Sequence, residues 1–585
     1  MKSLKTALLE LFTHTLHQVF PELQEQSIEI TVSANEKFGA YQCNSSMRFA
    51  KIVQMPARAI AEKWMDALQQ SEHPYKKWID KLEVAGPGFI NIWLNPITLA
   101  SFCDAMFIHP QFGIETDTTQ KVIVDFSSPN IAKEMHVGHL RSTIIGDSLC
   151  RLFEFFGLNV LRLNHVGDWG TAFGMLIAYL KEEIKENIYD QDVQLSDLVQ
   201  WYKASKARFD SDADFKKRAQ QEVVSLQSGD PENLKLWQLI CNISERAYHA
   251  VYEVLGVTIQ DRGESFYNPM LQTIVGLLEQ QALIEVSEGA KCVFLPGFKN
   301  REGEPLPFII QKSDGGFNYA TTDLAALYHR VHEEKGDRLI YVTDAGQATH
   351  FAMVFEVAAR AHFYEPQQVR CDHVPFGVVL GPDGKKFKTR SGETERLIDL
   401  LYTAITKAKE LIQQRQMTQN NFLNDEEVEH LSYVLGIGAV KYADLSCNRI
   451  NDYVFSYDRM LKFEGNTAAF MLYSYVRVHG IKRKIGDVTI DLQEIPLALQ
   501  EPQEKLLGQH LARFPDTLLG MAQDLMPHRL CEYLYDLAVH FNAFFRDCRV
   551  EGDSNQMPRL KLCELTARVL RCGLSILGLE TVDKM

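Results

Sequence analysis

The stretch that decides the fold runs from Ser127 to Thr143 and reads SSPNIAKEMHVGHLRST. It follows an apolar run, Lys121–Phe126, that is typical of a buried parallel strand. It leads into residues 140–156, whose apolar side chains recur at helical spacing and stop near Gly157. A strand, a turn and a helix start in this order leave backbone N–H groups and the positive end of a helix dipole facing outward, where an anion can bind.

Two histidines lie at the expected helix entry. His136 and His139 are three residues apart, so both side chains can face one pocket. Gly138 between them would let a flat ring approach the backbone closely. The pattern suits a site that holds a nucleotide while its α-phosphate is attacked. The alternative is that both histidines only cap the helix and pack against it.

A second strand–helix unit follows the first. Residues 159–164 form the expected strand, and the sequence HVGDWGT from His165 to Thr171 leads into another helix. Two consecutive units of about 30 residues predict a doubly wound parallel sheet, with ligands at the carboxyl ends of its strands. After a charged, helical insertion, the sheet is expected to resume at residues 308–311, 338–342 and 374–380.

The two ends of the chain differ from this α/β core. Strands at 27–32 and 89–94 predict an N-terminal α+β domain, and beyond residue 395 the periodicity is helical almost throughout. The fold class is therefore α/β: a doubly wound (Rossmann-type) parallel-sheet domain with a helical insertion, an N-terminal α+β domain and a C-terminal all-α helical bundle. The expected domains are 1–112, 113–395 with the insertion at about 180–290, a helical connecting region at 396–458, and 459–585.

Composition and charge exclude several classes of protein. The 585 residues are too many for a single core, and no apolar run reaches the ~18 charge-free residues of a membrane span. The eleven cysteines form no CxxC pair and no Cys/His cluster at zinc spacing, so we expect a cytoplasmic protein without a structural zinc or other bound metal. The N-terminus predicts an amphipathic helix, not a secretory signal.

The net charge of −15 argues against broad, non-specific nucleic-acid binding. Residues 456–585 hold sixteen Lys or Arg and seventeen Asp or Glu, so nearly all of the negative charge lies before them. A local surface for a polyanion is therefore expected in the C-terminal part.

A glycine- and lysine-rich loop, GPDGKKFKTRSG, spans residues 381–392. Its glycines predict mobility, and four cationic side chains within six residues would attract phosphates. The alternative is an ordinary surface turn rich in lysine.

Together these motifs resemble those of class I aminoacyl-tRNA synthetases, and their wording resembles the arginyl-tRNA synthetase family. The resemblance covers essentially the whole chain. It is carried by Ser128–Thr143, Asn164–Thr171 and Lys386–Gly392, and at the two ends by Lys37–Asn44 and Tyr533–Phe545.

The resemblance implies a two-step reaction on ATP, with Mg²⁺, L-arginine and tRNA(Arg). Arginine's carboxylate attacks the α-phosphate of ATP to give arginyl-adenylate, and the arginyl group then moves to the terminal ribose of the tRNA. Phosphoryl chemistry of this kind needs mainly positioning and charge neutralisation from the protein. His136, His139 and Lys386 would contact the phosphates, and Gly138 would admit the adenine ring.

One motif departs from the family's class. The signature of the mobile loop is Lys-Met-Ser-Lys-Ser, whereas this chain has KFKTR from Lys386 to Arg390, so Thr389 holds the position of the second lysine. By resemblance Lys133 compensates, with Lys388 or Arg390 sharing the task.

Substrate choice follows from the shape of a guanidinium, which is planar with five donors and is best bound by a bidentate carboxylate. By resemblance Asp323 is that carboxylate, with Tyr319 four residues earlier on the same helical face. The alternative for this pair is a helix N-terminal cap with packing. The rest of the amino acid is expected to contact Ser128, Asn130 and Gln347, with Asp125 at the α-ammonium group.

Contacts with tRNA are expected at Asn35 and Phe38 in a polar N-terminal loop, and at Tyr473 in the C-terminal part, where core packing is the alternative. The family is mostly monomeric, so a monomer is expected. Two other functions compete with the synthetase: a nucleotidylyltransferase, which also uses HxGH, and a tRNA-binding paralogue without catalysis.

Overall fold

The computed structural model describes residues 2–184, 193–381, 383–385, 395–419, 423–486 and 491–585. The chain forms two compact units, and each is described by itself. Unit 1 comprises residues 1–116, 462–575 and 580–585, and unit 2 comprises residues 117–461 and 576–579. These divisions fall near the expected boundaries at 112 and 458, but the two expected end domains lie together in unit 1.

Unit 2 is built on a five-stranded parallel sheet of order β12-β11-β5-β6-β7. The chain winds from β5 outward through β6 and β7, then returns to the other side of β5 through β11 and β12. This topology confirms the doubly wound sheet and places the switch point between β5 and β11. The strands are β5 (Lys121–Asp125), β6 (Asn159–Asn164), β7 (Gln260–Asp261), β11 (Arg338–Asp344) and β12 (Arg370–Phe376).

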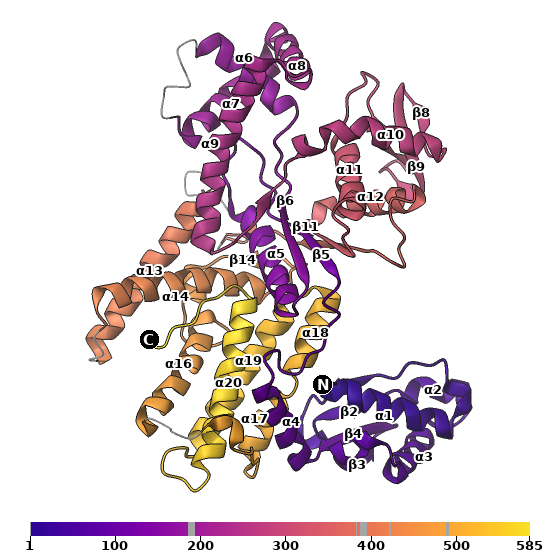
Figure 1. The fold of residues 1–585 in the computed structure, drawn as a ribbon, viewed down its shortest axis with the longest axis vertical. Helices are drawn as coiled ribbons and strands as arrows, with labels where there is room; N and C mark the ends of the chain where they lie inside the picture. Colours follow the sequence, from indigo (N-terminus) through magenta and orange to yellow (C-terminus); the bar gives the residue numbers. More distant parts are fainter. Residues whose placement is uncertain (1, 185–192, 382, 386–394, 420–422, 487–490) are drawn as a thin grey trace. The chain divides into compact units, whose positions relative to one another are not determined.

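The helix that follows the signature stretch, α5 (Val137–Phe155), packs on β5, β6 and β11 (Figure 1). Its close approach needs a glycine, because a Cβ at Gly146 would lie 2.2 Å from Cγ of Phe126. Elsewhere Ile123, Leu163 and Tyr341 of the sheet pack with buried residues of α10 (Leu271–Gln280), α11 (Tyr319–His332) and α12 (Ala348–Arg360). The sheet is thus buried between helices, which explains the continuous apolar run of β5.

In the described part of the chain between β6 and β7 there are four further helices, and their ribbons lie in one group in Figure 1. They are α6 (Thr171–Glu183), α7 (Leu195–Ser211), α8 (Ala213–Gln227) and α9 (Pro231–Leu255). The rest of unit 2 includes the helices α13 (Leu397–Gln419), α14 (Asp425–Leu445) and α15 (Tyr457–Met460) and the strand pair β13 (Val379–Leu380) and β14 (Tyr453–Val454).

Three expectations for the sheet were wrong. Residues 308–311 belong to β10 (Pro305–Gln311), which pairs with β9 (Ala290–Lys299) and β8 (Glu285–Ser287) in a separate antiparallel sheet. Residues 374–380 are not one strand, because β12 ends at Phe376 and β13 pairs elsewhere. The region expected as a helical insertion also contains β7, whose two residues are too few to give a strand pattern in the sequence.

Unit 1 combines a four-stranded antiparallel sheet of order β1-β2-β4-β3 with helices from both ends of the chain. Buried polar contacts join these ends: Lys561 Nζ lies 2.6 Å from Asp104 Oδ1, and Ser3 Oγ donates to Asp516. The strands are β1 (Ile30–Val32), β2 (Tyr41–Cys43), β3 (Ile79–Ala85) and β4 (Phe89–Leu94). The helices are α1 (Leu4–Val19), α2 (Ser46–Val53), α3 (Ala57–Gln70), α4 (Pro96–Ile108), α16 (Ala468–Ile485), α17 (Pro502–Leu511), α18 (Phe514–Asp524), α19 (His528–Asp547) and α20 (Gln556–Ile576).

Among the described helices, none combines the length and the apolar character that crossing a membrane requires.

The contact between Gly146 and Phe126 yields a prediction. Gly146→Ala forces the Phe126 ring to move inside a packed interior, and we expect a loss of about 1–3 kcal/mol in the free energy of unfolding. The matched control is Gly276→Ala in α10, where a new Cβ meets nothing within 4 Å and should stabilise the helix by up to about 1 kcal/mol. Urea denaturation followed by circular dichroism measures both. Equal effects in the two variants would contradict the close packing of α5.

Candidate active site

A cavity of about 330 Å³ opens where β5, β11 and β12 end, at the switch point of the sheet. Its walls come from the loop after β5, the start of α5, the loop after β11 and residues 376–379. The cavity brings together six residues that the sequence predicted for the site: Ser128, Asn130, His136, Gly138, His139 and Gln347.

The loop after β5 begins with two left-handed residues that are not glycine, Ser127 (φ 69°) and Ser128 (φ 49°). Such backbone is strained and persists only where its surroundings hold it. The amide of Ser127 donates to Ser142 Oγ of α5 (2.8 Å), and the amide of Ser128 donates to Asn164 Oδ1 of β6 (2.9 Å). Thr143 Oγ1 donates to Ser127 Oγ (2.9 Å).

Helix α9 holds the same loop from another direction. Tyr252 Oη lies 2.7 Å from Ser127 Oγ and accepts a hydrogen bond from Asn164 Nδ2 (3.2 Å). Earlier in α9, Ser244 Oγ accepts a hydrogen bond from the amide of Ala132 (3.1 Å), another left-handed residue of the loop. Tyr252 and Ser244 lie more than a hundred positions after the loop residues that they contact, so no local sequence pattern indicates these contacts.

His136 and His139 cap α5, which confirms the capping interpretation, and both also line the cavity. Their contact with a nucleotide stays a prediction. The amide of Gly138 donates to His136 Nδ1 (3.1 Å), and the amide of His136 donates to His139 Nδ1 (3.1 Å). An amide can only donate, so in each neutral ring Nδ1 is the acceptor and Nε2 carries the hydrogen. Burial, with help from the neighbouring His136, lowers the pKa of His139 to about 4. His139 is therefore a neutral hydrogen-bond donor at pH 7.

Gly138 is needed by the His136 ring itself. A Cβ at this position would lie 2.8 Å from His136 Cε1. The expected contact with adenine stays a prediction.

The cations expected near the phosphates are only partly described. Lys133 is exposed, and its Nζ lies 5.6 Å from the ring centre of Tyr202 in α7. It is close enough to His139 to contribute to the lowered pKa of that imidazole. Lys386 and Lys388, with Thr389 and Arg390, lie outside the described residues.

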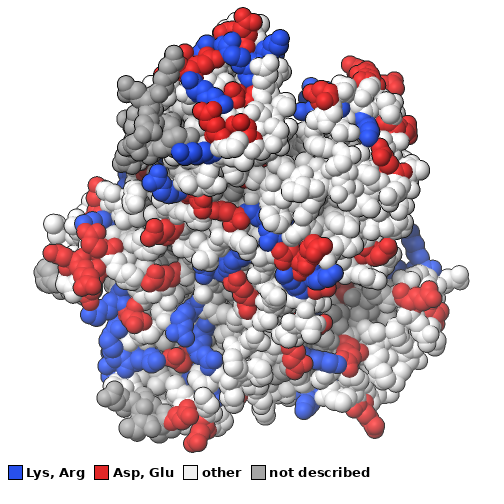
Figure 2. All heavy atoms as spheres, turned by 45° about the horizontal axis from the view of Figure 1, so that its top comes forward, with Lys and Arg blue, Asp and Glu red and all other residues white. Residues whose placement is uncertain are grey.

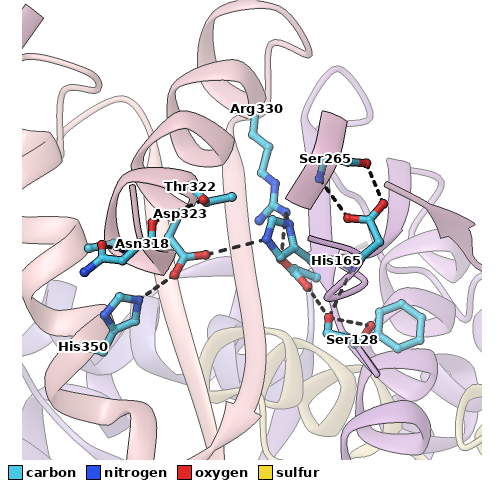
Figure 3. Close-up of polar contacts among 12 residues, drawn as sticks. Ser128, His165, Ser265, Asn318, Thr322, Asp323, Arg330 and His350 are labelled. Carbon is cyan, nitrogen blue, oxygen red and sulfur yellow. Dashed lines mark hydrogen bonds and ion pairs between the residues drawn. The ribbon is translucent and has the colours of Figure 1, made fainter. Parts of the chain in front are cut away.

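Asp323 lies in the first turns of α11 and contacts two histidines (Figure 3). His350 Nε2 is 2.6 Å from Asp323 Oδ2, and His165 Nε2 is 3.9 Å from Oδ1. The cap of α11 is Asn318, whose Oδ1 accepts from the amide of Ala320, so capping does not explain Tyr319 or Asp323. Tyr319 is 64% exposed, and its ring packs edge-on against His350 with centres 4.9 Å apart.

A second cavity, of about 450 Å³, is lined by Tyr319, Thr322, Trp169 and a carboxyl group that the sequence analysis missed, that of Glu264. Burial, then the nearby charges of Asp323 and Asp168, raise the pKa of Glu264 to about 8. A raised carboxyl pKa beside other acids marks a place that favours a cation. Glu264 stands in a polar stretch, RGES, and only its burial in the fold distinguishes it from a surface acid.

Asp168 is fixed by a different set of bonds. Its carboxylate accepts from the amide (2.8 Å) and the hydroxyl (2.6 Å) of Ser265, which Figure 3 shows beside the site. Its backbone oxygen accepts from Trp237 Nε1 of α9 (2.8 Å). Asp168 thus anchors the loop that carries Glu264.

Asp125 ends β5 and is 6% exposed. Its Oδ2 lies 2.7 Å from the guanidinium of Arg330 in α11, and its Oδ1 accepts from Ser128 Oγ (3.0 Å). The structure thus ties Asp125 to Ser128 of the cavity wall. Its expected contact with an α-ammonium group stays a prediction.

In unit 1, Tyr473 lines a groove of about 560 Å³ with Arg477, Arg483, Lys484 and Arg549. The Arg477 guanidinium lies 4.9 Å from the ring centre of Tyr473. This groove thus gathers several basic side chains. On the face of the molecule drawn in Figure 2, acidic and basic residues are interspersed.

The N-terminal loop of unit 1 carries the other two expected contact residues. Asn35 caps the short helix Glu36–Phe38 by accepting from the amide of Lys37 (3.0 Å), and Phe38 is 48% exposed. An exposed aromatic ring on a capped turn is available to a partner.

Three family models match the chain. The model described as tRNA synthetases class I (R), catalytic domain matches residues 103–457. The DALR anticodon binding domain matches residues 471–585, and the arginyl tRNA synthetase N terminal domain matches residues 6–94.

Curated relatives match over nearly their whole length. The arginine–tRNA ligase of Protochlamydia amoebophila is 55% identical, with 100% of both chains covered. That of Chlamydia caviae is 50% identical, with 97% of this chain and 96% of the relative covered. Among solved structures, arginyl-tRNA synthetase from Plasmodium falciparum superimposes with a TM-score of 0.87 at 33% identity, covering 100% of both chains.

The hydrogen bonds of Tyr252 to Ser127 and Asn164 lead to a prediction about the loop after β5. Tyr252→Phe removes a hydroxyl that serves both Ser127 and Asn164, which should cost about 1 kcal/mol or more. We expect the amides of the loop after β5 to exchange hydrogen for deuterium about fivefold faster, measured by mass spectrometry. The matched control is Tyr248→Phe, whose hydroxyl lies 3.4 Å from Asp261 of β7. Unchanged exchange in Tyr252→Phe would show that α9 does not hold the loop.

Proposed function

The chain belongs to the arginyl-tRNA synthetase family, and we propose from this premise that it activates L-arginine with ATP and transfers the arginyl group to tRNA(Arg). The observation that carries the proposal is the pairing of two different environments in unit 2. One cavity presents neutral imidazole donors at a helix start, which suits phosphates. The other is lined by Glu264, and the charges of Asp323 and Asp168 are close enough to raise the pKa of its carboxyl group, so this carboxyl cluster suits a guanidinium.

ATP would bind at the switch-point cavity. Nε2–H of His136 and of His139 would donate to phosphate oxygens, aided by the positive end of the α5 dipole. Lys133, Lys386 and Lys388 would neutralise phosphate charge as it develops on the pyrophosphate. Mg²⁺ would accompany the nucleotide; Asp344, on the cavity wall, is a carboxylate of the type this ion prefers.

The chemistry in this proposal has two steps. A carboxylate oxygen of arginine forms a bond to the α-phosphorus of ATP, and the bond to pyrophosphate breaks. A ribose hydroxyl of the tRNA then attacks the arginyl carbonyl, and AMP leaves. The protein supplies position and charge neutralisation, since the nucleophiles belong to the substrates.

Arginine would extend from the cavity wall to the carboxyl cluster. Asp323 and Glu264 would accept the guanidinium hydrogens, and the exposed Tyr319 would cover the group. Ser128, Asn130, Gln347 and Asp125 would hold the amino-acid end. Lysine lacks the planar fork of donors and cannot serve two carboxyl groups in the same way.

The tRNA would contact unit 1 at the groove beside Tyr473 and at the N-terminal loop that carries Asn35 and Phe38. A groove with several arginines and a stacked aromatic ring suits unpaired bases and phosphates. We propose that the enzyme acts as a monomer in the cytoplasm.

The first test is arginine-dependent exchange of pyrophosphate into ATP, with and without tRNA. We expect exchange in the wild type and a loss of roughly 100-fold or more in kcat/KM for arginine in Asp323→Ala, because a half-buried charged partner is removed. His139→Ala should reduce kcat instead. Exchange driven by a phosphorylated small molecule would indicate a nucleotidylyltransferase. Binding of tRNA with no exchange under any condition would indicate a paralogue without catalysis.

The second test concerns the Glu264 carboxyl group. Its pKa of about 8 means that it is protonated at pH 6.5, whereas a bound guanidinium favours the carboxylate form. Arginine binding must then release a proton, so the KM for arginine should fall by roughly tenfold between pH 6.5 and 8. Glu264→Gln should lose this dependence, while the KM for ATP serves as the internal control. An unchanged pH slope in Glu264→Gln would contradict the role of this residue.

A further inference from the structure

We propose that His350 is a positioning residue for arginine: it occupies one oxygen of Asp323 and thereby aims the other at the guanidinium. The inference rests on the proposed function, because it assumes that Asp323 binds the substrate side chain. His350 itself need not touch arginine.

The hydrogen bond between the two side chains is short and its direction is fixed. His350 Nε2 lies 2.6 Å from Asp323 Oδ2, and a carboxylate can only accept, so Nε2–H donates. Asp323 Oδ1 has no bond of comparable length among the described residues; its neighbour His165 Nε2 is 3.9 Å away. Figure 3 shows the carboxylate between these two rings.

The second ring, that of His165, does not form a hydrogen bond to Asp323 Oδ1. His165 Nδ1 faces Arg330 Nη2 at 3.5 Å, and a guanidinium nitrogen can only donate. In a neutral imidazole this leaves the hydrogen on Nε2, directed toward Asp323 Oδ1 across a gap too long for a hydrogen bond. Oδ1 is therefore the oxygen that remains for a substrate donor.

The imidazole of His350 is itself held by three aromatic rings from different elements. The ring centres of Tyr319 in α11, Phe351 in α12 and Phe308 in β10 lie 4.9, 5.3 and 5.8 Å from it. With 16% of its side chain exposed, the ring has little freedom to swing away. It therefore fixes the carboxylate of Asp323 and supports the exposed ring of Tyr319 at the same time.

The bond matters because Asp323 stands near another acid. The charge of Asp323 contributes to the raised pKa of Glu264, so the two groups repel when both are ionised. A donor on Oδ2 holds Asp323 against this repulsion without using Oδ1. A guanidinium would then be shared between Oδ1 of Asp323 and the carboxyl group of Glu264, instead of being gripped by both oxygens of Asp323.

The experiment compares His350→Ala with His350→Gln in arginine-dependent pyrophosphate exchange with the full-length enzyme. The Gln side chain places an N–H near the position of Nε2, so it should restore the bond. We expect the KM for arginine to rise about 10- to 50-fold in His350→Ala and less than fivefold in His350→Gln, with the KM for ATP within twofold of wild type in both. The matched control is His362→Gln, an exposed histidine that contacts Glu365.

A double-mutant cycle with Asp323→Asn separates positioning from packing. If His350 acts through the carboxylate, His350→Ala should add less than twofold to the KM for arginine in the Asp323→Asn background. Equal losses in His350→Ala and His350→Gln, or additive losses in the cycle, would overturn the proposal and leave only a packing role. Failure of the proposed function looks different, because the wild type would then show no arginine-dependent exchange at all.

Discussion

The left-handed turn at Ser127 and Ser128 is the constraint on which the rest of the site depends. Each non-glycine residue in this conformation costs of order 1–3 kcal/mol. The cost is offset by hydrogen bonds from β6, α5 and α9, which meet at this turn because β5 ends there. The same convergence aims the start of α5 at the cavity. The contacts that hold the strained turn therefore also order the wall of the switch-point cavity.

The two cavities differ in their ionisable groups: imidazoles line the first, and a carboxyl group lines the second. At the switch point backbone amides donate to Nδ1 of His136 and of His139, and the lowered pKa of His139 keeps that imidazole neutral at pH 7. Beside the second cavity burial raises the pKa of Asp168, and at the cavity it raises that of Glu264 to about 8, so Glu264 holds a proton at pH 7. In the proposed function the guanidinium of arginine would replace this proton, so that binding of the cation and ionisation of the carboxyl group are coupled. The carboxylate of Asp125 is buried as well, and its charge is balanced by the guanidinium of Arg330.

How much of this the sequence predicted depends on the range of the interactions. The run before Ser127, the HxGH spacing and the second strand–helix unit are local patterns, and they predicted the doubly wound parallel sheet and six residues of the cavity. β10 was misassigned because an apolar strand reads the same in either sheet. The pairing of β7, the burial of Glu264 and the hydrogen bonds of Tyr252 depend on contacts between distant segments. Periodicity and motif spacing therefore do not predict them.

The neutrality of His139 has a consequence for the division of labour in catalysis. At pH 7 an imidazole with a pKa of about 4 can donate a hydrogen bond to a phosphate, but it cannot offset the negative charge that gathers on departing pyrophosphate. That charge must be met by side chains that stay cationic. In the proposed function Lys133 would take this role, since its charge already contributes to the lowered pKa of His139, although its exposure leaves that charge screened by water. We propose that the lysines of the 381–392 loop act as additional cations beside Lys133, which would let this chain hold Thr389 where its class carries a second lysine.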